Sequence, residues 1–417
     1  MPSRDHGRAS SRPDGTAAPD VSAGSLGRLV DRLGTDLDRP VVLYDPAMNV
    51  LAFSAHSSHD VDANRSAAIL SRRTQPRALE LVHEAGVHRA HVPVVVPSDA
   101  GLADRIGMPV RHGGALLGYL VCVAEPGDLP VTDRYRSIVV DAAADLGLLL
   151  HAGDLQRRTH RAATAATVRD LLGDDPAIRG DAAGRLLRQG MPASSAGHLV
   201  LTFSGLPPGA DPGHSSLLEL EVLLDRATGT VASSVIGAVI GGAAVLVLPV
   251  APDHRRTVQR LADQLPDEVR LGIGAPRTDL VHVAGSAREA ALALSGAWHD
   301  PARHGRIARW RDLGADQLLL RLPLDRMGPA DLPEPVRLLL AARGGLELAR
   351  TAESYLDHGG DAQATARAIS IHRSTLYYRL DRIAALIGVD VRDGSVRHEL
   401  HTGLRVATLC GLRPVAG

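Results

Sequence analysis

The 417-residue sequence contains no lysine, so all 46 of its basic side chains are arginine. Together with the high alanine and glycine content, this is typical of a GC-rich coding sequence and carries no functional meaning by itself. Aromatic residues make up only 2% of the chain, and its two cysteines, Cys122 and Cys410, lie far apart. Their spacing excludes a disulfide framework and a paired-cysteine metal site, and it favours a reducing compartment, the cytoplasm.

An excess of either charge is also missing, because 46 basic and 47 acidic residues leave a net charge of -1. The chain is therefore not a polycation, and any binding of nucleic acid must come from a local basic patch. Hydrophobic residues form 45% of the sequence, as in ordinary globular proteins, and the length predicts roughly two to four domains. Residues 1–24 are polar, lack the apolar segment of a secretory signal and predict a disordered tail.

Charged residues are absent from residues 227–252, a stretch long enough to cross a bilayer. Gly237 and Gly241 have the spacing found in packed membrane helices, so a membrane-anchored sensor is one alternative. The other is a β-hairpin, because the stretch is rich in β-branched residues and has a Gly241-Gly242 turn pair. Serines and glycines dilute the hydrophobicity, and the sequence therefore favours the hairpin and no membrane.

Residues 25–150 predict a small α/β domain with the order helix, hairpin, helix, two-strand meander, helix. Asp45-Pro46 and Asn49 supply the turn of the first hairpin, and His112-Gly113-Gly114 supplies that of the meander. This order resembles a GAF/PAS-like sensor domain, which implies a pocket for an unknown small-molecule effector between the sheet and residues 65–85. Core packing alone would also explain the candidate lining residues, which are Tyr44, Phe53, Tyr119 and Cys122.

The segment HEAGVHRAH brings His83, Glu84, His88 and His91 close together. A zinc-protease motif needs its two histidines four residues apart on one helical face, whereas His83 and His88 are five apart across Gly86. Surface or structural histidines therefore explain the segment best. The sequence predicts no metal site and no cofactor.

Residues 151–328 predict a linker helix followed by a second α/β domain. The polar helix over 152–175 is long enough to pair with a second copy of the chain. The order of elements and the segment LGIGAPRTDL resemble the GGDEF-like domain of bacterial regulators. An active cyclase of that type needs an acidic residue at the Gly-Gly turn, whereas this turn reads Gly241-Gly242-Ala243-Ala244, so we expect a catalytically silent domain. A nucleotide-turnover enzyme related to diguanylate cyclases is the enzymatic alternative.

Residues 334–417 carry few strand signals and predict an all-helical domain. The helix LELARTAESYLD ends at Gly359-Gly360, Asp361 can cap the next short helix, and a third helix begins at Arg373 or Ser374 and ends at Gly388. A short helix, a tight turn and a longer helix form a helix-turn-helix. One apolar face of the third helix should pack on the helices before it: Leu376, Leu380, Ile383 and Ile387.

The opposite face of the third helix carries hydroxyl and guanidinium groups near its N-terminus, as a recognition helix in a major groove does. Arginine can bind guanine with two hydrogen bonds, while hydroxyls and backbone N–H groups suit a phosphate. A plain amphipathic helix with a solvated arginine face is the alternative. Tyr378 belongs to the outward face, and Tyr377 lies to one flank. The candidate DNA-binding residues are His372, Arg373, Ser374, Thr375, Tyr377, Tyr378, Arg379 and Arg382.

The segment TARAISIHRSTLYYRLDRIAALIGVD closely resembles the C-terminal DNA-binding domain of PucR-type (CdaR) bacterial transcriptional regulators. With the two looser resemblances before it, the family would cover nearly the full chain. The resemblance implies a signal-responsive regulator that binds double-stranded DNA as a homo-oligomer. The family pattern favours Asn in place of Ser374 and Arg in place of Tyr377 and Asp381, so we expect weaker phosphate contacts or a different operator.

The sequence thus predicts a multidomain, non-enzymatic transcriptional regulator of the cytoplasm. Its parts are an α/β GAF/PAS-like sensor (25–150), an α/β degenerate GGDEF-like domain (151–328) and an all-α helix-turn-helix domain (334–417). A signal at the N-terminal domains would shift the relative placement of two DNA-binding domains in an oligomer, and with it their fit to the half-sites of an operator.

Overall fold

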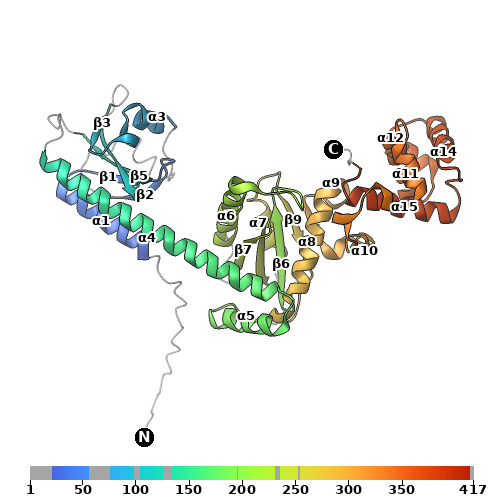
Figure 1. Ribbon diagram of the computed structural model, residues 1–417, viewed down its shortest axis with the longest axis horizontal. Coiled ribbons are helices and arrows are strands. Elements are labelled where there is room, and N and C mark those ends of the chain that lie inside the picture. The colour runs from blue at the N-terminus through green and yellow to red at the C-terminus, as the bar shows by residue number, and fades with distance from the viewer. Residues whose placement is uncertain are drawn as a thin grey trace, which may run out of the picture. The chain divides into compact units, whose positions relative to one another are not determined.

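The structure is a computed structural model, in which the chain divides into two compact units, Met1–His160 and Arg161–Gly417 (Figure 1). The boundary falls inside the 40-residue helix α4 (Asp133–Leu172), which confirms the continuous helix predicted there. Most of the predicted tail lies outside the described residues. The described residues are 21–55, 76–97, 104–124, 133–194, 196–230, 235–251 and 254–413.

The first unit contains a five-stranded antiparallel sheet of order β2-β1-β5-β4-β3. Its strands are β1 (Val41–Tyr44), β2 (Val50–Phe53), β3 (Val94–Val96), β4 (Arg105–His112) and β5 (Ala115–Val123). Its helices are α1 (Val21–Leu37), α3 (Pro76–Glu84), the 3-10 helix η1 (Val87–Arg89) and the first part of α4. The predicted order of elements is confirmed where it is described, and residues 56–75 lie outside that part.

Local turn chemistry explains the two connections predicted in this sheet. The Asp45 side chain accepts hydrogen bonds from the backbone N–H groups of Ala47 (2.9 Å) and Asn49 (2.8 Å), which closes the β1–β2 turn. Gly113 and Gly114 join β4 to β5 with φ angles of 56° and 83°, in the left-handed region that favours glycine. Both predicted turns are confirmed.

Each face of the first sheet carries its own core. Helices α1 and α4 cover one face, where Leu43, Val110 and Leu146 are buried. Helices α3 and η1 cover the other face, where Tyr44 and Tyr119 are buried with apolar residues of both helices. The strands are therefore apolar on both sides, as expected when helices cover both faces of a sheet.

The second unit contains a sheet of order β10-β9-β6-β8-β7, in which β9 and β10 run parallel and the other described pairs are antiparallel. Its strands are β6 (His198–Ser204), β7 (Ile236–Ile240), β8 (Ala243–Pro249), β9 (Arg270–Ile273) and β10 (Ile307–Arg309). The helices around it are α5 (Pro176–Arg188), α6 (Gly213–Thr230), α7 (His254–Ala262), η2 (Leu280–His282), α8 (Val283–His299), α9 (Pro301–His304), η3 (Trp310–Asp312) and α10 (Asp316–Leu319).

Within the long uncharged stretch, residues 236–249 form the β7–β8 hairpin, as predicted, while residues 227–230 end α6 and residues 231–234 lie outside the described residues. Gly241 and Gly242 have φ angles of 58° and 79°, and two positive φ angles at the central positions match the twist of a tight hairpin. Strand β8 also pairs with β6, which buries it inside the sheet. Among the described helices, none combines the length and the apolar character needed to cross a membrane.

Two glycines of β9 and its following loop allow helix α8 to approach the sheet closely. A Cβ at Gly272 would lie 2.0 Å from the carbonyl oxygen of Ala290, and one at Gly274 would lie 2.0 Å from that of Ser286. Ser286 Oγ in turn accepts a hydrogen bond from the backbone N–H of Val200 (2.9 Å). The two glycines therefore serve the packing of helix on sheet.

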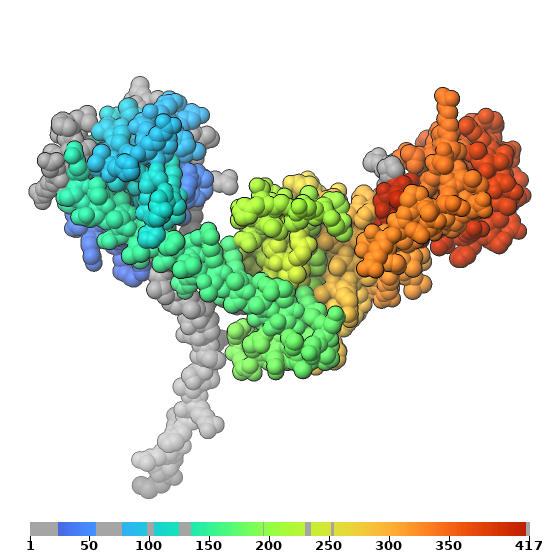
Figure 2. Space-filling model, viewed as in Figure 1, coloured from blue at the N-terminus to red at the C-terminus, as the bar shows by residue number. Residues whose placement is uncertain are grey.

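The C-terminal block is helical, as predicted, and its residues pack into one body (orange to red in Figure 2). Its elements are η4 (Leu324–Arg326), η5 (Pro329–Asp331), α11 (Glu334–Ala341), α12 (Gly345–Asp357), α13 (Ala362–Ala368), α14 (Arg373–Ile387) and α15 (Gly394–Leu409). One apolar core joins α11, α12, α14 and α15. This core holds α14 at the surface with one face free.

Candidate nucleic-acid interface

Helices α13 and α14 form the predicted helix-turn-helix, with α12 packed against both. The apolar face of α14 is buried as predicted, at Leu376, Leu380, Ile383 and Ile387. Ala366 of α13 belongs to the same core, and Ile369 packs against it. Burial of this face fixes which residues of α14 point outward.

The turn between the two helices is set by capping groups. The Asp361 carboxylate accepts hydrogen bonds from the backbone N–H groups of Gln363 (2.8 Å) and Ala364 (3.0 Å), and these bonds lower its pKa. Ser370 carries the turn in the left-handed region, with a φ of 54°. His372 caps α14 by accepting from the backbone N–H of Ser374 (3.3 Å), so the helix begins at Arg373. Gly388, with a φ of 72°, ends it as predicted.

Most of the eight predicted DNA-binding residues lie on the exposed surface of the first two turns of α14. Tyr378 is 67% exposed, so most of its side chain is available for contact with another molecule. Thr375 and Arg379 are half-buried. The exposed members are His372, Arg373, Ser374, Tyr377, Tyr378 and Arg382.

The tyrosine at the flank has a structural partner on its own helix. Arg373 Nη2 donates a hydrogen bond to the Tyr377 hydroxyl (2.9 Å), and the guanidinium carbon lies 5.4 Å from the centre of the Tyr377 ring. This i, i+4 pair holds a cation beside the N-terminus of α14 and keeps the other guanidinium nitrogens free to bind an anion. Tyr377 therefore positions Arg373.

Arg379 is tied to the neighbouring helix. Its guanidinium pairs with Glu347 of α12 and donates to Thr351 Oγ1 (3.2 Å), and the side chain is only 21% exposed. Arg382 stays exposed and makes one long bond, to the carbonyl oxygen of Arg343 (3.3 Å). Arg379 thus fastens α14 to α12, whereas Arg373 and Arg382 flank the outward face.

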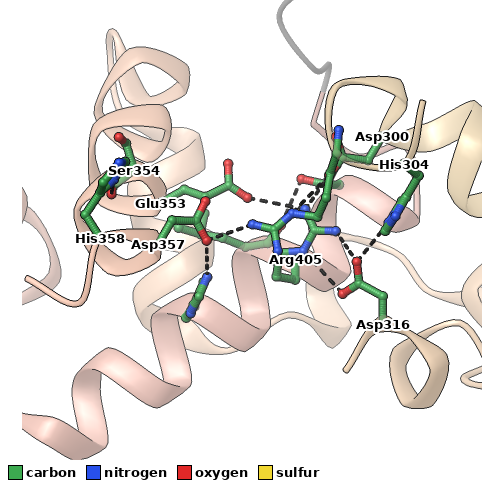
Figure 3. Close-up of polar contacts among 12 residues, drawn as sticks. Asp300, His304, Asp316, Glu353, Ser354, Asp357, His358 and Arg405 are labelled. Atoms are coloured by element: carbon green, nitrogen blue, oxygen red, sulfur yellow. Dashed lines mark hydrogen bonds and ion pairs between the residues drawn. The ribbon is translucent and has the colours of Figure 1, made fainter. Parts of the chain in front are cut away.

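A buried polar network joins the C-terminal helical domain to the segment that follows α8 (Figure 3). Arg405 of α15 pairs with Asp300, at the start of α9, and with Asp316 of α10. His304 Nε2 lies 2.9 Å from Asp316 Oδ2, the oxygen with which Arg405 Nη2 also pairs, and Glu353 of α12 lies 3.7 Å from the Arg405 guanidinium. All these side chains are buried or nearly so, and they were not predicted from the sequence.

A second, more exposed set of contacts extends the network. Asp357 of α12 lies 2.7 Å from Arg303 Nη2 and 2.9 Å from His401 Nε2. Arg413 pairs with Glu353, which also faces Arg405. One charged cluster therefore joins α9, α10, α12 and α15. It fixes α12 and α15 relative to the segment that follows α8.

The aspartates of this cluster predict a loss of stability in acid. Burial raises the pKa of Asp316, but hydrogen bonds from His304 and Arg405 outweigh this effect and lower the pKa to about 2. Burial also raises the pKa of Asp357, and hydrogen bonds from His401 and Arg303 outweigh it and lower that pKa to about 2. Because the folded pKa lies below the ordinary 3.8, the stabilisation is complete above pH 4 and is lost as the pH falls towards 2. Denaturant titrations at pH 2 to 5 should show this decline, and Asp316→Asn should make it shallower.

The first sheet does not bring the four predicted ligand-lining residues together. Tyr44 and Tyr119 are paired across β1 and β5 on the face under α3, where a pocket was expected. Cys122 is buried on the opposite face, against α1 and α4, and so cannot line that pocket. Phe53 is 45% exposed. Two of the four residues thus remain on the expected face as buried core.

Two domain families match this chain. Residues 348–406 match the PucR C-terminal helix-turn-helix domain, and residues 119–295 match a GGDEF-like domain. The Carbohydrate diacid regulator of Escherichia coli (strain K12) is 26% identical over 322 residues, which are 73% of this chain and 80% of that protein. The helix-turn-helix match covers α13, α14 and nearly all of α12 and α15, the elements described above.

Solved structures with detectable similarity are more distant. The Regulator of Polyketide Synthase Expression from Bifidobacterium adolescentis has 19% identity and a TM-score of 0.27, over 59% of this chain and 97% of that one. PelD 158-CT from Pseudomonas aeruginosa PAO1 has 18% identity and a TM-score of 0.19, over 71% and 94%. Both scores are too low to support a conclusion about this fold. The helix-turn-helix match, the GGDEF-like match and the regulator relative agree with the exposed α14, and the chain is a transcriptional regulator with a PucR-type C-terminal helix-turn-helix domain.

Proposed function

We propose that this regulator reads its operator with the exposed face of α14, under the control of a small molecule received by the first unit. The observation that carries the proposal is the outward face of α14, where Arg373 and Tyr378 in the N-terminal half, and Arg382 one turn further along, lie free of the apolar core. In a recognition helix this half enters the major groove. Arg382 would contact base edges or phosphates, Arg373 a phosphate, and the Tyr378 hydroxyl a phosphate. His372, Ser374 and Thr375 would contact the backbone at the helix start.

Arg379 has a different part in this proposal. Its bonds to Glu347 and Thr351 orient α14, so its contact with DNA would be secondary to its contact with α12. Replacement of Arg379 would therefore change both stability and DNA binding, and it is a poor probe of either one alone.

The Arg405 network supports a route for the signal. It fixes the DNA-binding domain to the end of the GGDEF-like domain through buried charges, so a movement of that domain would carry α12 and α15 with it. The β7–β8 turn of this domain has alanines where an active cyclase needs a carboxylate, which supports a transmitting and non-enzymatic role.

A homo-oligomer would set the spacing of two such DNA-binding domains. Leu148 and Leu155 lie seven residues apart on α4, and each side chain is more than half exposed, which suits pairing with the same helix of a second copy. The GAF/PAS-like character of the first unit is supported by its antiparallel sheet with helices on both faces. Because operators are reached in the cytoplasm, the regulator would act there.

The DNA-binding face is tested by charge removal. Arg373→Ala and Arg382→Ala should each weaken binding to promoter DNA by about 10-fold or more, since a guanidinium contact to a base or phosphate contributes at least about 1–2 kcal/mol. Arg326→Ala is the matched control, because that arginine is 85% exposed in η4, outside the helix-turn-helix. Fluorescence anisotropy with labelled duplexes measures the affinities. If all three variants fold and bind DNA with the affinity of the unchanged protein, this face of α14 does not contact DNA.

A further inference from the structure

The sheet face under α3 and η1 gathers side chains that suit a negatively charged group. His83 lies on α3, His88 on η1, Arg111 on β4 and Tyr119 on β5. The Tyr119 side chain is fully buried, and its hydroxyl lies 3.3 Å from His83 Nε2. The ring centroids of His83 and His88 are 4.7 Å apart, and the two ring planes are inclined at 61°. Four elements thus bring two imidazoles, a guanidinium and a phenol to one place.

Two nitrogens in this group are buried without a hydrogen-bond partner among the described residues. Arg111 uses its Nη1 to donate to the Gly114 carbonyl oxygen (3.1 Å) and its Nη2 to donate to that of His88. The Arg111 Nε and the His88 Nδ1 are left unpaired. A buried polar atom without a partner costs free energy, and such atoms are rare unless a ligand or water completes the site.

The group also lacks a compensating negative charge. Among the described residues no carboxylate forms an ion pair with His83, His88 or Arg111; Glu84, next in sequence to His83, pairs with Arg77 instead (3.0 Å). Burial lowers the pKa of His88, and the positive charges of His83, Arg89 and Arg111 lower it further. The surroundings therefore repel further positive charge and favour an anion.

We propose that His83, His88, Arg111 and Tyr119 form a binding site for the anionic group of a small ligand, a carboxylate or a phosphate. The anion would accept hydrogen bonds from Arg111 Nε and His88 Nδ1, the two groups left unpaired among the described residues, and would balance the charge of the Arg111 guanidinium. The inference rests on the proposed sensing role of the first unit and specifies the class of its ligand. Tyr119 belongs to the site because its hydroxyl lies within hydrogen-bond distance of His83 Nε2 (3.3 Å) and so orients the His83 ring.

The site can be probed in the full-length protein with small anions. Diethyl pyrocarbonate modifies accessible imidazoles, and mass spectrometry of the peptides reports each histidine separately. We expect succinate or inorganic phosphate, added at constant ionic strength against chloride, to slow modification of His83 and His88 several-fold in a dose-dependent way. His214, exposed on α6, should react at an unchanged rate. Protection by succinate alone indicates a carboxylate ligand, and protection by phosphate alone indicates a phosphate. No protection by either anion would refute the proposal.

Three variants connect the protection to the proposed residues. Arg111→Gln should weaken the apparent affinity for the protecting anion by about 10-fold, as expected when one charge-assisted hydrogen bond is lost. Tyr119→Phe keeps the buried ring and removes only the hydroxyl, so it provides a second test if Arg111→Gln does not fold. His112→Asn is the control, because His112 follows Arg111 but stacks on His151, 4.4 Å away on the opposite face. Full protection in both Arg111→Gln and Tyr119→Phe would place the anion elsewhere.

Promoter binding, measured with and without the protecting anion, separates this inference from the proposed function. A change in DNA affinity on anion binding would support both. Protection of the histidines without any change in DNA affinity would leave the anion site standing and contradict the sensing role. Promoter binding without any protection of the histidines would refute the anion site and leave the proposed DNA-binding function unaffected.

Discussion

Arg405→Ala should lower the free energy of unfolding of the second unit by about 3–5 kcal/mol, the usual result of removing one partner from a buried ion pair. The change would leave Asp300 and Asp316 buried side by side, each about 5% exposed, without the guanidinium that joins them. Urea titration followed by tryptophan fluorescence would measure the loss. Both tryptophans, Trp298 and Trp310, belong to this unit, and Trp310 packs in the same core as Leu409 of α15.

The matched control for this variant is Arg303→Ala. Arg303 pairs with Asp357 in the same cluster (2.7 Å) and is only at the limit of ion-pair distance from Asp300 (3.9 Å). Arg303 and Asp357 are a third or more exposed, and an exposed pair contributes at most about 1 kcal/mol. We therefore expect the loss of unfolding free energy to depend on how deeply the ion pair is buried, and not on the number of ion pairs removed. Similar losses in the two variants would contradict the role given to the buried network.

Leu380→Ala should destabilise the DNA-binding domain by about 2–5 kcal/mol, because it removes a buried side chain from the core that joins α14 to α12. Tyr378→Ala, two residues earlier on the same helix, should change stability by no more than about 0.5 kcal/mol, since that side chain lies on the surface. Thermal and urea unfolding measure both effects.

The same pair of variants should separate folding from recognition. Tyr378→Ala should weaken DNA binding while the protein stays folded, and Leu380→Ala should weaken it only as far as the domain unfolds. If Leu380→Ala were neutral for stability and Tyr378→Ala strongly destabilising, the two faces of α14 would be assigned the wrong way round.

Much of the fold follows from local sequence signals. Asp361 and Gly388 mark the ends of helices, and Gly241-Gly242 and Gly113-Gly114 mark tight turns, because each of these residues acts on a backbone only a few positions away. The apolar face of α14 could also be predicted, since helical periodicity places its members on one side. The face that remains then identifies the candidate DNA-binding residues.

The partners of these residues could not be predicted in the same way. Arg405 meets Asp316 and Asp300 across 89 and 105 residues of sequence, and Arg379 meets Glu347 across 32, so no local pattern reveals either contact. An arginine that a helical wheel places near the outward face of α14, such as Arg379, can thus form its contacts with a neighbouring helix of the same domain. The separation of the predicted lining residues, in contrast, could have been predicted from the sequence. Tyr119 and Cys122 are three residues apart on one strand, and the alternation of side chains along a strand places them on opposite faces of the sheet.

The binding of DNA through α14 is tested most directly by measuring the affinity for promoter DNA as a function of salt concentration. Purified full-length protein would be titrated with the DNA upstream of its own gene and neighbouring genes, in the presence of competitor DNA, at several salt concentrations. We expect saturable binding that resists competitor and weakens steeply with salt, with a log-log slope of affinity against salt reduced by about one in Arg382→Ala and unchanged in Arg326→Ala. Failure of the folded protein to bind any of these duplexes at low salt, with and without succinate or phosphate, would contradict this expectation.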